Sequence, residues 1–229
     1  MLSARRLAAA RACVHSRSVA LTVDIFSDIV CPWCFIGTRR LEHVLAERGI
    51  ADSTEVTYRT FLLDPSTPVE GKNIPDMIRQ KYGRDPAPMF ARVEAEARSS
   101  NIPLELSKQP MSYSTVAAHT LLRHAIELGT QRPLAKAMFE RYFLDAKNIA
   151  DPTVLTELAV AHGFTKERAE ALITDEAELA ITKKEQDVPR QLGISGAPFF
   201  IFNGKIAVSG AQPEKVFHQV LDEIAATPA

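Results

Sequence analysis

The clearest chemistry in the sequence lies in two cysteines with two residues between them, Cys31-Pro32-Trp33-Cys34. Such a pair can close a small disulfide ring or supply two ligands to a metal ion. A structural zinc site takes four ligands, usually as two pairs, and the sequence has no second CxxC, CxxH or HxxxH. Two inert core cysteines are the other alternative, because cysteine packs as a small apolar residue. The pattern favours a redox-active dithiol and no metal.

The two cysteines are expected to have different roles because a helix begins between them. Apolar residues recur at helical spacing after Trp33, and proline is favoured at a first helical position. The N–H groups and the dipole at a helix N-terminus stabilise a thiolate, so Cys31 is the expected nucleophile. Cys34, one turn further in and more buried, is then the resolving thiol that attacks the mixed disulfide. Trp33 gives the nucleophile an apolar neighbour that suits a substrate chain.

Strand and helix patterns show how the pair is positioned. Runs rich in β-branched and aromatic residues at 21–26 and 55–63 predict strands before and after the helix over 33–48. This order forms a βαβ unit whose strands pair in parallel. Between 64 and 189 the patterns are helical, and the predicted helices span 74–81, 88–99, 114–128, 133–144, 152–162, 166–173 and 176–192. No strand is expected among them.

The C-terminal part returns to strand patterns. Residues 199–202 and 205–208 predict two strands joined by a tight turn at Asn203-Gly204, and 213–225 predicts a helix. The whole order is βαβ, a long helical segment, then ββα. We therefore predict an α/β, thioredoxin-like fold: a four-stranded mixed sheet from 21–63 and 190–226, with a large all-helical domain over 64–189 inserted between the two halves.

A second motif lies just before the third strand, at residues 193–200 (GISGAPFF). A proline after a glycine-rich turn is a candidate for a cis peptide bond, since only X-Pro bonds make the cis form cheap. If cis, Pro198 would present the Ala197 backbone to an extended substrate chain beside Cys31. A trans proline at the start of an edge strand is the alternative.

Composition and charge argue against two classes of partner. The formal net charge of -1 and a pI near 6.6 give no general attraction to nucleic acid. No apolar run approaches the roughly 18 to 20 residues that a membrane-spanning helix needs. We therefore expect neither nucleic acid nor a membrane as partner, while the oligomeric state is left open.

The first 20 residues differ from the rest in composition. They contain four arginines (Arg5, Arg6, Arg11 and Arg17), and no acidic residue precedes Asp24. A basic, serine-containing and acid-poor segment is typical of a mitochondrial transit peptide. A disordered basic tail and a secretory signal are the alternatives. We expect a mitochondrial protein, with the cytoplasm as the alternative location, and no role for Cys13 in the mature chain.

Three motifs together resemble the FrnE-like branch of the DsbA family of thioredoxin-fold oxidoreductases: residues 30–37 (VCPWCFIG), 193–200 (GISGAPFF) and 208–212 (VSGAQ). The similarity runs from about residue 21 to residue 224, with the motifs in the family's order. It implies a thioredoxin fold with an inserted helical domain, a redox-active pair at Cys31 and Cys34, and a cis Pro198 facing them. Pro32, Trp33 and Ala197 would complete the wall of the site.

The resemblance implies thiol–disulfide exchange with protein dithiols or disulfides, or with glutathione as co-substrate, and no cofactor beyond the cysteine pair. Oxidase, reductase and isomerase directions are all open. Two other functions stay possible: a glutathione-dependent kappa-type transferase or isomerase, which has serine where Cys31 stands, and a redox-independent peptide-binding chaperone. Asp28 is expected to be a solvated loop carboxylate, and His119 a surface or core histidine without a catalytic role.

Overall fold

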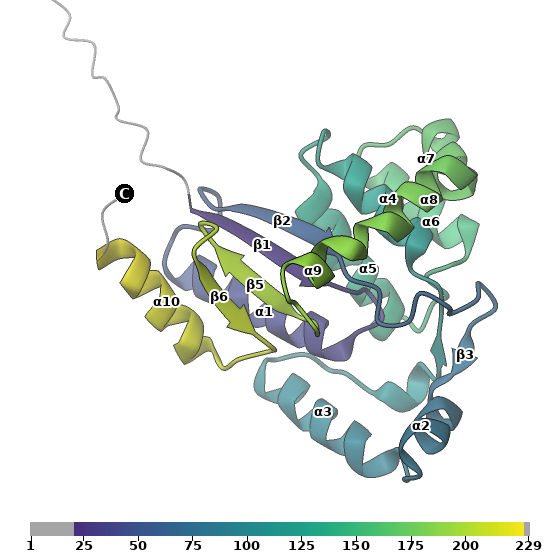
Figure 1. The fold of residues 1–229 in the computed structure, drawn as a ribbon, viewed down its shortest axis with the longest axis horizontal. Coiled ribbons are helices and arrows are strands. Elements are labelled where there is room, and N and C mark those ends of the chain that lie inside the picture. The colour runs from purple at the N-terminus through teal and green to yellow at the C-terminus, as the bar shows by residue number, and fades with distance from the viewer. Residues whose placement is uncertain (1–20, 227–229) are drawn as a thin grey trace, which may run out of the picture.

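A computed structural model describes residues 21–226, so the predicted transit peptide over 1–20 lies outside the described residues. Four strands form one mixed sheet in the order β2-β1-β5-β6 (Figure 1). β1 (Thr22–Ser27) pairs in parallel with β2 (Glu55–Thr60), and β5 (Phe199–Phe202) runs antiparallel to β1 and to β6 (Ile206–Ser209). The predicted βαβ and ββα halves are confirmed, and they join where β1 lies beside β5.

The hairpin between β5 and β6 turns where the sequence predicts. Asn203 and Gly204 both have positive φ angles, 49° and 65°, and Lys205 N donates to Phe202 O at 2.9 Å. Phe202 pairs with Ile206, so Lys205 belongs to the turn and β6 begins one residue later than predicted. Asn203 is also bonded to the start of β1, because its Oδ1 accepts from Thr22 N at 2.9 Å and its own N donates to Thr22 O at 2.9 Å. The turn thereby fixes the register of the C-terminal half against the N-terminal half.

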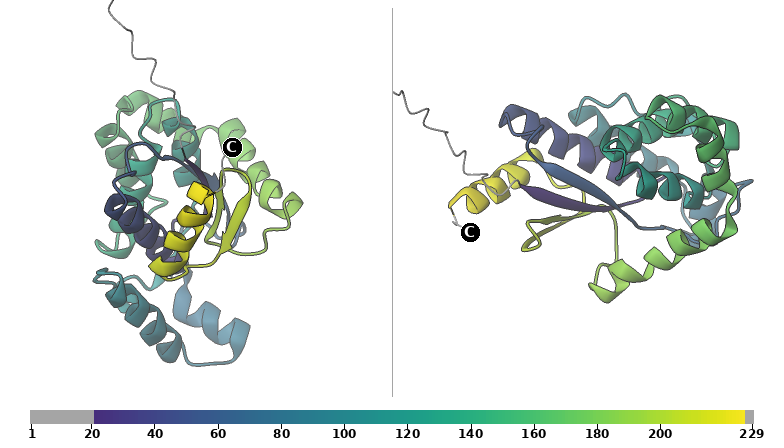
Figure 2. Two further views of the ribbon diagram at one scale, coloured as in Figure 1. Left: turned by 90° about the vertical axis from the view of Figure 1, so that its left-hand side faces the viewer. Right: turned by 90° about the horizontal axis from the view of Figure 1, so that it is seen from above.

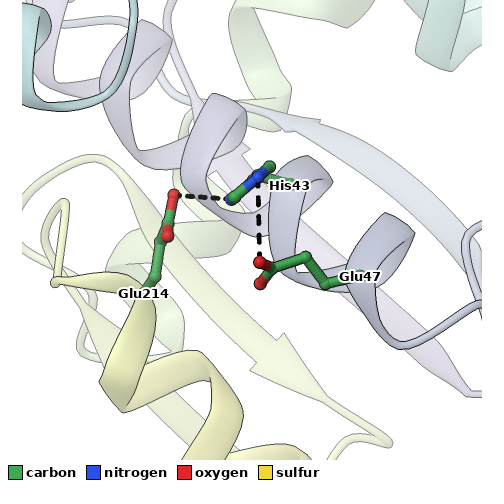
Figure 3. A group of neighbouring side chains, drawn as sticks. All are labelled: His43, Glu47 and Glu214. Carbon is green, nitrogen blue, oxygen red and sulfur yellow. Dashed lines mark hydrogen bonds and ion pairs between the residues drawn. The ribbon is translucent and has the colours of Figure 1, made fainter.

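Two helices, α1 (Pro32–Glu47) and α10 (Glu214–Ala226), lie side by side on one face of the sheet (Figure 2). On their solvent side, His43 Nδ1 lies 3.0 Å from Glu214 Oε1 and His43 Nε2 lies 3.9 Å from Glu47 Oε1 (Figure 3). The two ring nitrogens of His43 thus face different carboxylates, so the three side chains do not point at a common centre. This group is a set of polar contacts between α1 and α10 on the solvent side of the two helices.

Between β2 and β5 the chain is mostly helical. The helices are α2 (Ile74–Tyr82), α3 (Ala87–Ser99), α4 (Val116–Ala125), α5 (Gln131–Phe143), α6 (Pro152–Ala161), α7 (Lys166–Thr174), α8 (Glu176–Glu185) and α9 (Asp187–Gln191), with a 3-10 turn at Leu106–Lys108. In Figure 1, α2 and α3 form one lobe and α4 to α8 another. No helix within residues 21–226 is long and apolar enough to cross a bilayer.

The prediction of an all-helical insertion is wrong in one respect. Lys72–Asn73 (β3) pairs antiparallel with Met111–Ser112 (β4), and strands of two residues leave no alternating pattern in a sequence. The helix predicted over 176–192 is also divided, between α8 and α9. Pro189 explains the break, because it lacks an N–H for the Glu185 carbonyl and its ring would clash there.

The insertion and the sheet share one apolar core. Phe35 of α1 stacks on Phe139 and on Phe143 of α5, with ring centroids 5.5 Å apart in each case. Insertion side chains cover the edge of β2 and of the residues just after it. Gln131 Oε1 accepts from Tyr58 N (2.9 Å) and its Nε2 donates to Tyr58 O (3.0 Å), and Gln186 bonds the N–H and C=O of Leu62 in the same way. The insertion is therefore attached to the sheet by apolar packing and by hydrogen bonds from glutamine side chains to the backbone.

Candidate active site

Cys31 lies immediately before α1, as the sequence predicts. Its backbone is extended at the N-cap position (φ -90°, ψ 112°), and Pro32 takes the first helical turn, where a missing N–H costs nothing. Cys31 O accepts from Cys34 N (3.0 Å) and Phe35 N (3.2 Å), while Cys31 N donates to Asp28 O (3.1 Å). Both cysteines are free thiols in this structure and both are buried, Cys34 completely. The structure therefore places Cys31 at the N-cap of α1, where its side chain makes no capping hydrogen bond.

The Cys34 thiol is held in its neutral form. Burial raises the pKa of Cys34 well above its usual value, and the neighbouring Cys31 raises it further. The Asp28 N–H and the Ser27 hydroxyl lower this pKa. The Ser27 hydroxyl is buried and has no hydrogen-bond partner among residues 21–226, so it is available to a thiolate at Cys34. Sequence reasoning missed Ser27, because a serine at the end of a strand carries no signal.

The wall opposite Cys31 is the peptide between Ala197 and Pro198. This bond is cis, which agrees with the prediction and excludes the trans alternative. Cys31 Sγ lies 3.9 Å from Ala197 O. Pro198 O accepts from Gly210 N at 2.8 Å, so the wall is attached to the 208–212 motif. The motif at residues 30–37 and the motif at residues 193–200, far apart in the sequence, therefore meet at the Cys31 thiol.

Two residues of α1 that the sequence did not single out support this wall. A Cβ on Gly37 would lie 3.1 Å from Pro198 Cγ and 3.3 Å from Ala211 Cα, so only glycine lets the helix approach this closely. Arg40, 6% exposed, donates from Nη1 to Ala211 O (2.8 Å) and pairs through Nη2 with Glu96 of α3 (2.6 Å). Arg40 thereby joins α1, the wall and the insertion. Arg39 and Arg40 are adjacent arginines of the same predicted helix, and the sequence does not show which of the two is buried. For this reason the sequence analysis missed Arg40.

We expect Gly37→Ala to lower the free energy of unfolding by about 1–2 kcal/mol, because overpacking of rigid neighbours outweighs the better helix propensity of alanine. It should also slow disulfide exchange, since the wall must move relative to Cys31. Denaturant unfolding and an exchange assay measure the two effects. Gly196→Ala is the matched control, because a Cβ at Gly196 meets nothing within 4 Å. Equal stability and activity of the two variants would contradict the importance of this close approach.

A cavity of about 550 Å³ opens beside Cys31, towards α2 and α3. Its lining includes the predicted site residues Cys31, Pro32, Trp33 and Ala197, whereas Cys34 and Pro198 lie behind this surface. The walls are largely apolar, with Met77, Ile78, Met89, Phe90 and Val93 among them. The Arg92 guanidinium lies 5.9 Å from the centre of the Trp33 ring. The cavity can therefore take an apolar group next to the thiol.

Asp28 corrects one expectation from the sequence. It is 2% exposed and not solvated: Oδ2 accepts from Leu63 N at 2.8 Å, and Oδ1 lies 3.3 Å from His119 Nε2. His119 is a core histidine, 3% exposed, on α4 of the insertion. The sequence did not indicate the pair because its members are 91 positions apart. The structure thus places an acid and a base directly behind the turn that carries Cys31.

A dithiol at the first helix of a mixed four-stranded sheet, facing a cis proline, defines a thiol–disulfide oxidoreductase of the thioredoxin class. The DSBA-like thioredoxin domain matches residues 22–222, and the chain belongs to this family. The predicted DsbA family is therefore confirmed, while the FrnE-like branch within it stays a prediction.

Three known proteins show the extent of the similarity. The probable DsbA oxidoreductase SCO1869 from Streptomyces coelicolor is 32% identical, with 91% of this chain and 92% of that chain covered and a TM-score of 0.81. The uncharacterized protein YwbO of Bacillus subtilis (strain 168) is 24% identical in an alignment 210 residues long that covers 88% of this chain and 96% of YwbO. The cytosolic disulfide reductase DsbM from Pseudomonas aeruginosa, solved with GSH, shares the fold at 16% identity, with 89% and 99% covered and a TM-score of 0.65.

Proposed function

We propose that the protein exchanges thiols and disulfides through Cys31 as the attacking group and Cys34 as the resolving group. The observation that carries this assignment is the placement of the Cys31 sulfur: it stands at the N-terminus of α1, 3.9 Å from Ala197 O and on the wall of the cavity. Cys34 lies one turn behind it, fully buried and beyond the reach of a substrate. Only Cys31 can meet a partner first.

The exchange balances in two steps. The Cys31 thiolate attacks one sulfur of a substrate disulfide, a mixed disulfide forms, and the other substrate sulfur leaves as a thiolate and takes a proton. Cys34 then loses its proton and attacks the Cys31 sulfur, which closes the Cys31–Cys34 disulfide and releases the second substrate thiol. The substrate gains two electrons and the cysteine pair loses two. The reverse sequence oxidises a dithiol substrate.

The partners we propose are protein dithiols or disulfides, or glutathione. The Ala197 carbonyl offers an acceptor to the main chain of an extended peptide, and DsbM, which shares this fold, was solved with GSH. No cofactor is needed beyond the cysteine pair. A mitochondrial location follows from the composition of residues 1–20 and is part of the proposal. The kappa-type alternative is less well supported, because a thiol stands at position 31.

The experiment that tests this function is a redox titration in glutathione buffers, on a Cys13→Ser chain so that only the pair reports. Free thiols are trapped by alkylation and the protein mass is measured by mass spectrometry. Cys31 and Cys34 should change together from two thiols to one disulfide in a single two-electron transition. A midpoint near about -270 mV would indicate a reductant and one near about -120 mV an oxidant. If the pair forms no disulfide at any poise, the proposal is wrong. Glutathione conjugation that survives loss of both cysteines would instead favour the transferase alternative.

A further inference from the structure

Asp28 is a buried carboxylate that takes no part in the two steps above, yet it contacts three parts of the molecule. Its backbone O accepts from Cys31 N (3.1 Å), its Oδ2 accepts from Leu63 N (2.8 Å), and its Oδ1 lies 3.3 Å from His119 Nε2. Asp28 also lines the cavity beside Cys31. A carboxylate buried this deeply persists only when partners replace its lost hydration.

On the His119 side of the Asp28–His119 pair, the neighbouring charged side chains form ion pairs with one another. His119 lines a second cavity of about 310 Å³, between α4, α8, α9 and the sheet. The other charged residues on its walls form ion pairs, Arg59 with Asp24 (2.7 Å) and Arg123 with Glu185 (3.8 Å). These four groups therefore bring little net charge to the buried pair.

Groups on the Cys31 side are paired with an opposite charge, exposed to solvent as Lys81 is, or neutral. Lys72 bonds to Asp64 (2.6 Å) and holds the pKa of Asp64 below its usual range, and Lys81 lies 5.4 Å from the centre of the Tyr82 ring. Burial raises the pKa of the Tyr142 phenol, and burial raises that of the Cys34 thiol, so both stay neutral near pH 7. His119 is the buried basic side chain that contacts the Asp28 carboxylate directly, and it is thus placed to offset the charge of Asp28.

We propose that His119 carries a proton that neutralises Asp28, so that the thiolate of Cys31 forms beside a pair without net charge. This rests on the exchange chemistry proposed above and assigns positioning roles to two residues that do not touch the substrate. Like charges in one buried site oppose each other's ionisation, so an unmatched Asp28 carboxylate would work against the thiolate that attack requires. An imidazole is suited to this because it can bind a proton near neutral pH.

The test is a pair of substitutions with opposite expected effects, made in the Cys13→Ser chain. Asp28→Asn keeps an acceptor for Leu63 N and removes the negative charge, whereas His119→Gln keeps a donor for Asp28 and removes the positive charge. The rate of Cys31 alkylation by iodoacetamide is measured against pH, with the modified peptide identified by mass. We expect the midpoint to fall by about one pH unit in Asp28→Asn, to rise by about one in His119→Gln, and to return towards the control value in the double variant.

The matched control is His162→Gln, at the end of α6, where His162 Nδ1 lies 2.7 Å from Leu158 O and far from the cysteines in the chain. It should leave the alkylation midpoint unchanged. A purely structural role would lower thermal stability without opposite shifts, so shifts in the same direction, or none, overturn the proposal. Should His119→Gln not fold, an unshifted midpoint in Asp28→Asn overturns it alone. If Cys31 and Cys34 form no disulfide in the Cys13→Ser chain itself, the proposed function fails instead.

Discussion

Cys31→Ser is expected to lower disulfide exchange by at least about 10²-fold, because a serine hydroxyl does not ionise near neutral pH and forms no disulfide. Cys34→Ser should fail differently. The first attack still occurs in that variant, but nothing resolves the product, so a mixed disulfide between Cys31 and the substrate accumulates. Mass spectrometry without reductant detects this adduct, and turnover of a reduced or disulfide-bonded peptide measures the rate.

Cys13→Ser is the control for both cysteine variants and should exchange at the full rate. The pH dependence offers a further check on the division of roles. Burial raises the pKa of Cys34, so the resolving thiolate becomes more abundant as pH rises and the second step should accelerate through the alkaline range. Undiminished turnover in Cys31→Ser, or an adduct formed on Cys34 in place of Cys31, would contradict the assigned roles.

Phe35→Ala is expected to cost about 3–5 kcal/mol in the free energy of unfolding, as for other fully buried phenylalanines. Phe35 is 2% exposed and stacks on Phe139 and on Phe143, so its loss opens a cavity between α1 and the insertion. Because Phe35 N also bonds to Cys31 O, the same change should disturb the first turn of α1 and reduce exchange. Equilibrium unfolding in urea measures the stability effect.

Leu128→Ala is the control for this substitution, because Leu128 follows α4 in the insertion and is 46% exposed. It should change the free energy of unfolding by no more than about 0.5 kcal/mol. A loss in Phe35→Ala no larger than that of Leu128→Ala would mean that the insertion and the sheet do not depend on the shared aromatic cluster.

Local patterns in the sequence were sufficient for the fold class. The period-2 run at β1, the Asn203-Gly204 turn and the helical spacing after Trp33 each reflect neighbours in the chain, and all three are found where expected. The β3 and β4 strands were not predicted, because two residues are too few to show a period. The break before α9 was missed, although Pro189 was a visible signal for it.

The site was predictable only as far as its chemistry depends on motifs. The CPWC sequence predicts its own place at a helix N-terminus, whereas the glycine-rich segment made Pro198 only a candidate for a cis bond and the family resemblance supplied that expectation. The partners of Asp28 and Arg40 come from α4, α3 and the 210–212 segment, so their burial depends on tertiary packing. A single sequence does not distinguish Asp28 from a solvated loop residue.

Gln131 makes the outer edge of β2 a poor template for another strand, and Gln186 does the same for the segment just after it. The unpaired N–H and C=O groups of an exposed edge strand can pair with a strand of another molecule, which leads to aggregation or domain swapping. Here the amide groups of two side chains imitate a peptide bond and occupy the N–H and C=O of Tyr58 and Leu62. The insertion therefore also blocks the pairing of another chain along this edge, and this effect is independent of the redox chemistry.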